Sequence, residues 1–137
     1  MHDGTIGQYA LHVQCPWRID GPKGIVTGRG DLWEHISGKV MPNEWEPSLD
    51  DNLQDLQLSN LLGSYDAKTL SHVNSGEWLM VEQVKASAVG DLDIILSGGY
   101  HLILFPGGST GEAWRIFEPD NDSPHFVVEG NEVYSDN

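Results

Sequence analysis

Two short apolar runs joined through a pair of glycines constrain the fold of this chain more than any other feature. The runs span residues 92–96 and 100–105, and Ser97 precedes the two glycines between them. Adjacent glycines tolerate the positive φ angles of a tight turn, so we expect a two-residue hairpin loop at Gly98 and Gly99. That loop sets the register Leu96 opposite His101, Ile95 opposite Leu102, Ile94 opposite Ile103 and Leu92 opposite Phe105. Both faces are then partly apolar, which predicts a hairpin at the centre of a sheet with cover on each side.

Alternating or β-branched segments indicate further strands on both sides of this hairpin. Residues 8–19 form an extended stretch whose apolar side chains share one side, and Pro16 marks an edge or a bulge within it. The apolar side consists of Leu11, Val13, Cys15, Trp17 and Ile19. A turn at residues 20–24 leads to a returning strand at residues 25–27. Later strands are expected at residues 78–84, 113–117 and 125–129, the last of these being the final strand.

One segment has the pattern of a helix. Ser48 and Asp51 have the spacing of a capping box, and acidic residues favour a helix N-terminus. Leucines then follow at a spacing that predicts an amphipathic helix over residues 49–62. The apolar stripe consists of Leu49, Leu53, Leu56, Leu61 and Leu62, and Leu58 falls outside it. We expect this helix to lie across one face of the sheet.

Together these elements predict an α+β fold, made mainly of an antiparallel β-sheet with one principal α-helix packed on it. The 137 residues have the length of a single domain, in which residues 1–7 are expected to be poorly ordered. The irregular segment at residues 28–47 carries two tryptophans and is expected to wrap around the core. No apolar run reaches the ~18 residues of a membrane span, and the single cysteine agrees with a reducing compartment. We therefore expect a cytoplasmic protein.

Acidic residues far outnumber basic ones in this chain. There are 21 Asp and Glu against 7 Lys and Arg, which gives a formal net charge of −14. Such a charge repels polyanions, so we expect no nucleic-acid partner. The acid is concentrated in residues 44–66 and again after Arg115. Runs of this kind are typical of a solvated surface. The alternative is a docking surface for a basic protein, with Glu118, Asp120 and Asp122 as the candidate partner-binding residues.

Two arginines and two histidines are the candidates for a ligand site. Trp17-Arg18 and Trp114-Arg115 repeat the same pair, and in a strand each arginine points away from its tryptophan. One interpretation has the tryptophans in the core and the arginines paired with exposed carboxylates. In the other, the two arginines converge with Gln14 on one sheet face and bind an anionic group. The candidate ligand-binding residues are His12, Arg18, His101 and Arg115. A core histidine bound to a backbone carbonyl is the other interpretation of His101.

Three further patterns do not predict a site. The glycine-rich residues 106–111 lack the lysine and the spacing of a phosphate-binding loop and precede a strand, so we expect a hairpin loop. The acidic turn at residues 118–125 lacks the EF-hand pattern and is expected to be solvated. Cys15 falls on the apolar side of its strand, which predicts a buried, inert thiol and not a nucleophile. We therefore expect no catalytic residue, no metal and no cofactor.

Two blocks of the sequence are similar to a known group of proteins. Residues 11–19, LHVQCPWRI, and residues 111–128, GEAWRIFEPDNDSPHFVV, resemble blocks of a family of uncharacterised bacterial proteins, largely actinobacterial. The segment SGGYHLILFP resembles the same family more weakly. This family has no established activity, so the resemblance implies no catalytic residues. It also implies further residues before the first block.

Two classes of function remain open. The first is a non-catalytic module that docks a basic protein partner, as small acidic immunity proteins do, which is an analogy from charge and size. The second is a small-anion-binding protein or enzyme with a pocket over the sheet face, lined by the four ligand candidates. A pocket in which these groups converge favours the second class, and a convex acidic face without such a pocket favours the first.

Overall fold

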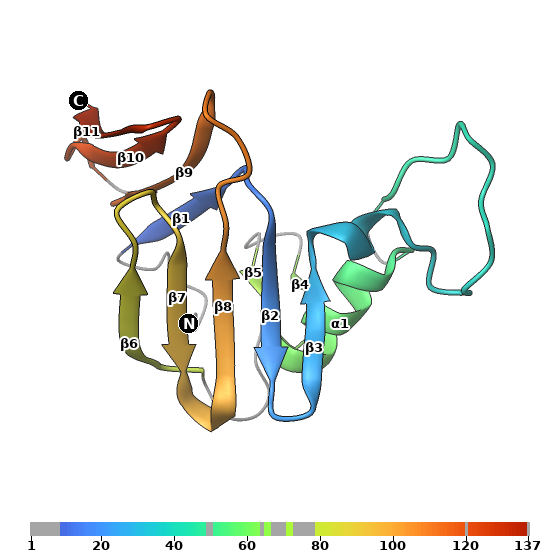
Figure 1. Ribbon diagram of the computed structural model, residues 1–137. Coiled ribbons are helices and arrows are strands. Elements are labelled where there is room, and N and C mark those ends of the chain that lie inside the picture. The colour runs from blue at the N-terminus through green and yellow to red at the C-terminus, as the bar shows by residue number, and fades with distance from the viewer. Residues whose placement is uncertain are drawn as a thin grey trace.

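Two main antiparallel sheets and one α-helix make up the described part of the chain (Figure 1). The computed structural model describes residues 9–48, 51–63, 65–66, 71–72, 79–119 and 121–136. This architecture confirms the predicted α+β class, with mainly antiparallel sheet and one principal helix. The expected disorder of residues 1–7 lies outside the described residues. No helix in the described ranges has the length and hydrophobicity to cross a membrane.

The larger sheet has five strands in the order β3-β2-β8-β7-β6. Its strands are β2 (Trp17–Gly21), β3 (Gly24–Gly28), β6 (Val81–Ala86), β7 (Leu92–Leu96) and β8 (Tyr100–Leu104). The apolar hairpin β7–β8 is flanked by β6 on one side and β2 on the other, which confirms its predicted place inside a sheet. The first hairpin, β2–β3, also forms as predicted.

The loop of the β7–β8 hairpin has three residues instead of the predicted two. A 3-10 turn, η2 (Ser97–Gly99), joins the strands, so Leu96 pairs with Tyr100. Gly98 and Gly99 adopt positive φ angles of 77° and 84°, as expected. The extra loop residue shifts the whole register by one, and the predicted pairs, such as Leu96 with His101, are therefore wrong.

The true register gives the five-stranded sheet one apolar face and one mixed face. The apolar face carries Trp17, Ile19, Leu92, Ile94, Leu102 and Leu104. The opposite face carries Arg18, Asp20, Asp93 and His101 beside Ile95 and Ile103. Both faces are therefore partly apolar, as predicted, although the shifted register changes which residues of the two strands share a face.

The smaller sheet has four strands in the order β1-β9-β10-β11. They are β1 (Ala10–Val13), β9 (Glu112–Phe117), β10 (His125–Glu129) and β11 (Glu132–Asp136). The strand β11 follows the segment that was predicted to be the last strand, and Gly130 turns the chain between them with a φ of 58°. Two short strands, β4 (Tyr65–Asp66) and β5 (Ser71–His72), pair separately.

Two crossovers connect the main sheets. The stretch predicted as one strand is divided at residues 14–16, where the chain leaves β1 and enters β2. Residues 105–111 carry it back from β8 to β9, so the expected hairpin loop at 106–111 is a crossover between sheets. The crossovers lie side by side: Gln14 N–H donates to the Ala113 carbonyl at 2.8 Å, and Phe105 N–H donates to the Pro16 carbonyl at 3.0 Å.

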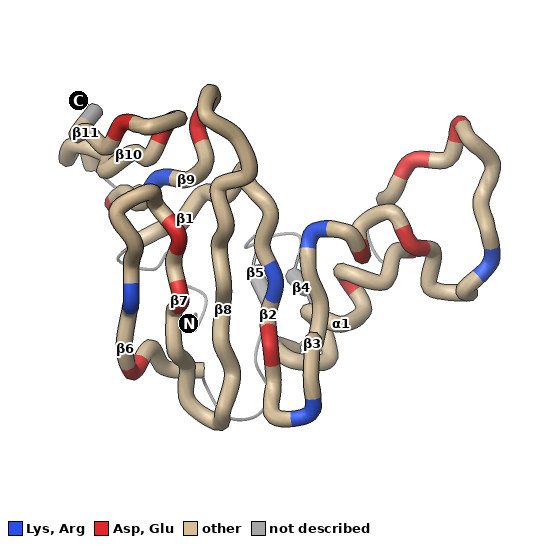
Figure 2. Tube along the Cα trace, in the orientation of Figure 1, with Lys and Arg blue, Asp and Glu red and all other residues tan. Residues whose placement is uncertain are grey.

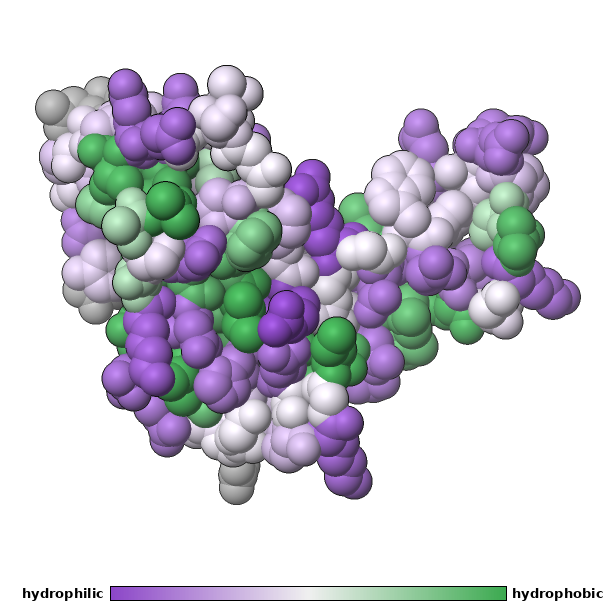
Figure 3. Space-filling view, in the orientation of Figure 1, coloured by the Kyte–Doolittle hydropathy of each residue, from purple (hydrophilic) through white to green (hydrophobic). Residues whose placement is uncertain are grey.

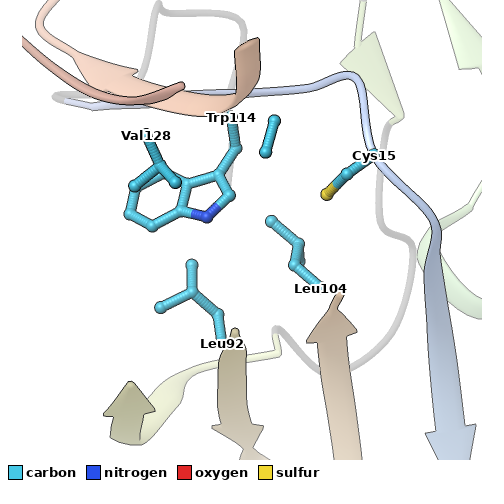
Figure 4. Close-up of a cluster of buried hydrophobic side chains, with 6 residues drawn as sticks. Cys15, Leu92, Leu104, Trp114 and Val128 are labelled. Atoms are coloured by element: carbon cyan, nitrogen blue, oxygen red, sulfur yellow. The ribbon is translucent and has the colours of Figure 1, made fainter. Parts of the chain in front are cut away.

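The core lies where the end of the five-stranded sheet meets the inner face of the four-stranded sheet (Figure 4). Trp114 and Val128 come from the smaller sheet, and Leu92 and Leu104 face them from the larger one. Cys15 lies beside them at the crossover. All five are buried, and Leu104 has no exposed surface. The apolar alternation of the strands therefore places the core at the seam between the two sheets.

The helix α1 (Leu53–Leu62) begins later than predicted. Its N-cap is Asn52, whose side chain accepts a hydrogen bond from the Asp55 backbone N–H at 2.9 Å. Ser48 and Asp51 do form capping-box contacts, at 2.8 and 3.0 Å, but before the helix. The sequence held two capping signals, and the second one starts the helix.

The helix covers one end of the larger sheet and not its centre. Its main contacts are with β3 and with a 3-10 turn, η1 (Arg29–Trp33). Leu56 is 42% exposed and Leu58 is half-buried, so the predicted stripe is wrong at these two positions. Leu49 lies outside the described residues.

Residues 34–48, here called the projecting loop, extend away from both sheets (Figure 1). We expected this segment to wrap the core. Instead Val40 is fully exposed, and Trp33 at the base of the loop is 62% exposed. An isolated antiparallel bridge joins His35, near the start of the loop, to Asn52, the N-cap of α1.

Candidate functional site

The four candidate ligand residues lie on two different sheets. His12 and Arg115 are direct cross-strand neighbours in β1 and β9. Arg18 and His101 lie in β2 and β8, where His101 is opposite Asp20. The predicted convergence of the two arginines on one sheet face is wrong, because the crossover at residues 14–16 places them in separate sheets. The structure therefore brings the candidates together as two pairs and not as one site.

Arg115 belongs to a network on the four-stranded sheet. Its Nε donates to both carboxylate oxygens of Glu112, at 3.0 and 3.1 Å, its Nη2 also donates to Glu112, and its Nη1 contacts His125 Nδ1 at 2.8 Å. Gln14 Nε2 donates to Glu112 at 3.0 Å. The hydrogen bond from Arg115 is the main reason why the pKa of Glu112 lies below its usual range. The Arg115 guanidinium thus pairs with the Glu112 carboxylate, whose side chain is only 13% exposed. The sequence had predicted a pair with an exposed carboxylate.

The other pair lies on the mixed face of the five-stranded sheet. Arg18 Nε donates to Asp20 at 2.8 Å, and this bond raises the pKa of Arg18. His101 Nδ1 lies 2.7 Å from Asp93 Oδ1, and 37% of its side chain is exposed. His101 therefore contacts a carboxylate at the surface, and its interpretation as a core histidine bound to a backbone carbonyl is wrong.

Four surface hollows lined by described residues do not unite the candidates. Arg18 lines one of about 220 Å³, beside Ile103 and Phe105. His12, His101 and Arg115 line none of these four. The hollows therefore give no support to a pocket shared by the four residues.

The acidic residues that were predicted to bind a partner follow β9. Glu118 is half-buried and lines a hollow with Ile116 and Phe126. Asp122 is exposed. Asp120 lies outside the described residues. Within the described ranges, no group of three or more His, Cys, Asp or Glu residues is placed to hold a metal ion.

Cys15 is buried, as predicted, with 5% of its surface exposed. Burial raises the pKa of its thiol, although hydrogen bonds to the backbone and the charge of Arg29 act in the opposite direction. The thiolate is the reactive form of cysteine, so a raised pKa agrees with an inert thiol. Its low reactivity stays a prediction.

The feature that sequence analysis missed is an aromatic cluster at the base of the projecting loop. The rings of Trp33 and Trp45 meet edge to face with centroids 6.5 Å apart, and His35 meets Trp45 in the same way at 5.8 Å. Figure 3 shows apolar residues interspersed with hydrophilic ones over the loop. Three glutamates, Glu34, Glu44 and Glu46, are exposed around the cluster.

Asp51 closes the projecting loop. Its carboxylate accepts hydrogen bonds from the Ser48 backbone N–H at 2.8 Å and from the Ser48 hydroxyl at 3.0 Å. Burial alone raises the pKa of Asp51, but hydrogen bonds from Ser48, Asn52 and Trp45 together lower it. The Asp51 carbonyl also accepts the Ile36 N–H at 3.0 Å. The aromatic cluster is therefore held by specific contacts, although it is far from the core.

One signal in the sequence marked this surface. Trp33 is followed by Glu34, and Trp45 lies between Glu44 and Glu46. A tryptophan with carboxylates directly beside it is hard to bury, because the charged neighbours must be buried with it. Counting apolar residues alone led to the wrong expectation of a core-wrapping segment.

Comparison with known proteins gave no match to this chain, whether to a family model, to a curated protein or to a solved structure.

Proposed function

We propose that this protein is a non-catalytic binding module whose projecting loop docks a basic protein partner. One observation carries the proposal: Trp33 is 62% exposed at the base of the projecting loop, whose three glutamates are exposed as well. Tryptophans are among the residues that contribute most binding energy at protein interfaces, and carboxylates around them select a partner of opposite charge.

The charge of the loop supports a basic partner. It contains three glutamates and one basic residue, Lys39, and Figure 2 shows the acidic positions spread along it. The whole chain carries a formal net charge of −14, so its long-range field favours the approach of a basic partner. Complementary charge steers the encounter, and the aromatic cluster then supplies apolar contact area.

The alternative, an anion-binding pocket over a sheet face, has less support. It required His12, Arg18, His101 and Arg115 to line one concave site, and they lie on separate sheets. Both arginines are already paired with carboxylates of this chain. The proposal includes a cytoplasmic location, which the single cysteine supports because it forms no disulfide within the chain.

Site-specific photo-crosslinking in the native host tests this proposal. A photoreactive residue in place of Val40, which is fully exposed on the loop, should capture a basic protein. The matched control is the same residue in place of Val89, which is 64% exposed in the turn between β6 and β7. Capture of the same protein from both positions, or of an acidic protein from position 40, would contradict the proposal.

The captured protein is then purified and its affinity measured directly. Trp33→Ala should weaken binding at least tenfold, because truncating a central interface tryptophan typically costs more than about 1.4 kcal/mol. Ile25→Ala, at a residue that is 70% exposed on β3, serves as the control and should leave the affinity unchanged. Equal affinities of the two variants would show that the loop is not the docking surface.

A further inference from the structure

A pocket of about 290 Å³ lies at the seam between the two main sheets. We call it the seam pocket. Its walls are the two crossovers, residues 14–16 and 105–111, which the hydrogen bonds described above hold together. Cys15 and Ala113 line it on the core side, and Arg29 lines it from the start of η1. Segments far apart in the sequence thus form one concave site.

Arg29 is the unusual residue of the seam pocket. The guanidinium groups of Arg18 and Arg115 both form ion pairs, whereas that of Arg29 has no hydrogen-bond or ion-pair partner among the residues that the structure describes. Its positive charge lowers the pKa of the Cys15 thiol, although burial raises that pKa by more. The charge of Arg29 is therefore felt at Cys15, on the core side of the pocket. In a chain with 21 acidic residues, an arginine without a carboxylate beside it is available to an external anion.

The second crossover lines the same pocket with backbone N–H groups that have no described partner. Gly107, Gly108, Thr110 and Gly111 line the pocket, and no N–H group from residue 107 to residue 111 donates to a described residue. Without side chains, the glycines let a ligand approach the backbone closely. A β-carbon built on Gly108 would meet nothing nearer than 4.0 Å, so there is room beside it. Successive unpaired N–H groups in a loop are a recurrent way to bind anions.

Glu112 is the one acidic residue of the pocket wall, and its charge is balanced. Arg115 binds its carboxylate with both Nε and Nη2, and Gln14 donates to it as well. The pair of Glu112 and Arg115 carries no net charge, which leaves Arg29 to set the charge of the pocket.

We propose that the seam pocket binds an oxyanion, the phosphate or carboxylate group of a small molecule, through the Arg29 guanidinium and the backbone N–H groups of Gly107, Gly108, Thr110 and Gly111. The sequence alone argued against a phosphate-binding loop here, because the glycine-rich segment lacks the lysine and the spacing of such a loop and precedes a strand. The fold supplies the missing cation from Arg29, which lies far away along the chain.

Titration of the whole protein with inorganic phosphate, and separately with acetate, tests the inference. Sodium chloride at equal ionic strength is the reference, because it screens charge without offering an oxyanion. At least one of the two should bind saturably by calorimetry and raise the melting temperature above the chloride reference. Binding of phosphate alone identifies a tetrahedral group, and binding of acetate identifies a carboxylate. If neither binds saturably at millimolar concentration, the inference is overturned.

Variants of the pocket wall give the second test. Arg29→Gln should weaken oxyanion binding at least tenfold, whereas Arg18→Gln, which removes an arginine outside the pocket, should not. Gly108→Asp adds a competing carboxylate to the lining of the same pocket and should abolish binding, and Gly108→Ala is its control for the added side chain. Melting curves without ligand show that each variant is folded. Equal losses in Arg29→Gln and Arg18→Gln would overturn the inference, as would normal binding by Gly108→Asp.

Discussion

Leu104 shows at the residue scale how this fold is stabilised. It has no exposed surface and belongs to the core cluster in which both sheets meet. Replacing it with alanine removes buried methyl groups and leaves a cavity, so Leu104→Ala should lower the free energy of unfolding by about 2 to 5 kcal/mol. Leu56→Ala is the matched control, because Leu56 is 42% exposed on α1, and it should cost less than about 1 kcal/mol. Urea unfolding followed by tryptophan fluorescence measures both, and similar costs would contradict the assigned core.

Glu112 makes stability depend on pH. Hydrogen bonding to Arg115 lowers its pKa in the folded protein. The stabilisation that the ionised Glu112 gives the fold is therefore fully present at pH values above the usual pKa of a glutamate. It is lost as the pH falls through the lowered pKa. Glu112→Gln should cost about 1 to 3 kcal/mol at neutral pH, and this cost should shrink as the pH falls below the usual pKa of a glutamate. Glu132→Gln, at an exposed position on β11, is the control. A cost for Glu112→Gln that does not change with pH would argue against the ionised pair.

At the scale of elements, the sequence located most strands but not their assembly. The apolar runs and the pair Gly98-Gly99 identified the central hairpin, and both glycines do adopt positive φ angles. Its register depended on whether Ser97 belongs to the loop or to the strand, and a serine before two glycines fits both. The division at Pro16 was also hidden, because a proline is compatible with a bulge in one strand and with a passage between two sheets. That division separated the candidate ligand residues.

Contact between the sheets depends on the turn that joins β6 to β7. Trp114 Nε1 donates to the Gly90 carbonyl at 2.8 Å, and Gly90 has a φ of 93°. A β-carbon at this position would lie 2.6 Å from Val128 Cγ1. Gly90→Ala should therefore cost roughly 2 to 4 kcal/mol, from backbone strain together with overpacking. Gly38→Ala is the control for strain alone, because its φ is 76° and its surroundings are empty, and it should cost about 1 kcal/mol. Equal costs in thermal unfolding would show that the two sheets are not tightly packed at this turn.

At the scale of the whole molecule, the two acidic surfaces considered for docking lie at opposite ends. The projecting loop extends from the β3 end, and the segment with Glu118 and Asp122 follows β9 (Figures 1 and 2). The excess of acidic residues predicted that charge governs association with a partner. It did not show which of the two acidic surfaces, the loop or the segment after β9, the partner would contact. The loop differs by having an exposed aromatic cluster among its carboxylates. The difference depends on contacts of Asp51 and Trp45 that only the folded chain reveals.

The association rate with the captured partner, measured by stopped flow at increasing salt, is the most direct test of docking through the projecting loop. The rate should fall steeply with salt, because steering acts on encounter, and it should be several-fold slower at low salt for Glu44→Gln/Glu46→Gln. The double variant Glu82→Gln/Glu132→Gln makes the same charge change at exposed positions on the sheets and should slow association less. The variant Glu118→Gln/Asp120→Asn/Asp122→Asn removes acidic charge from the segment after β9, and its association rate tests whether that segment steers the partner. A rate that is independent of salt, or a loop variant as fast as the sheet control, would contradict docking through the projecting loop.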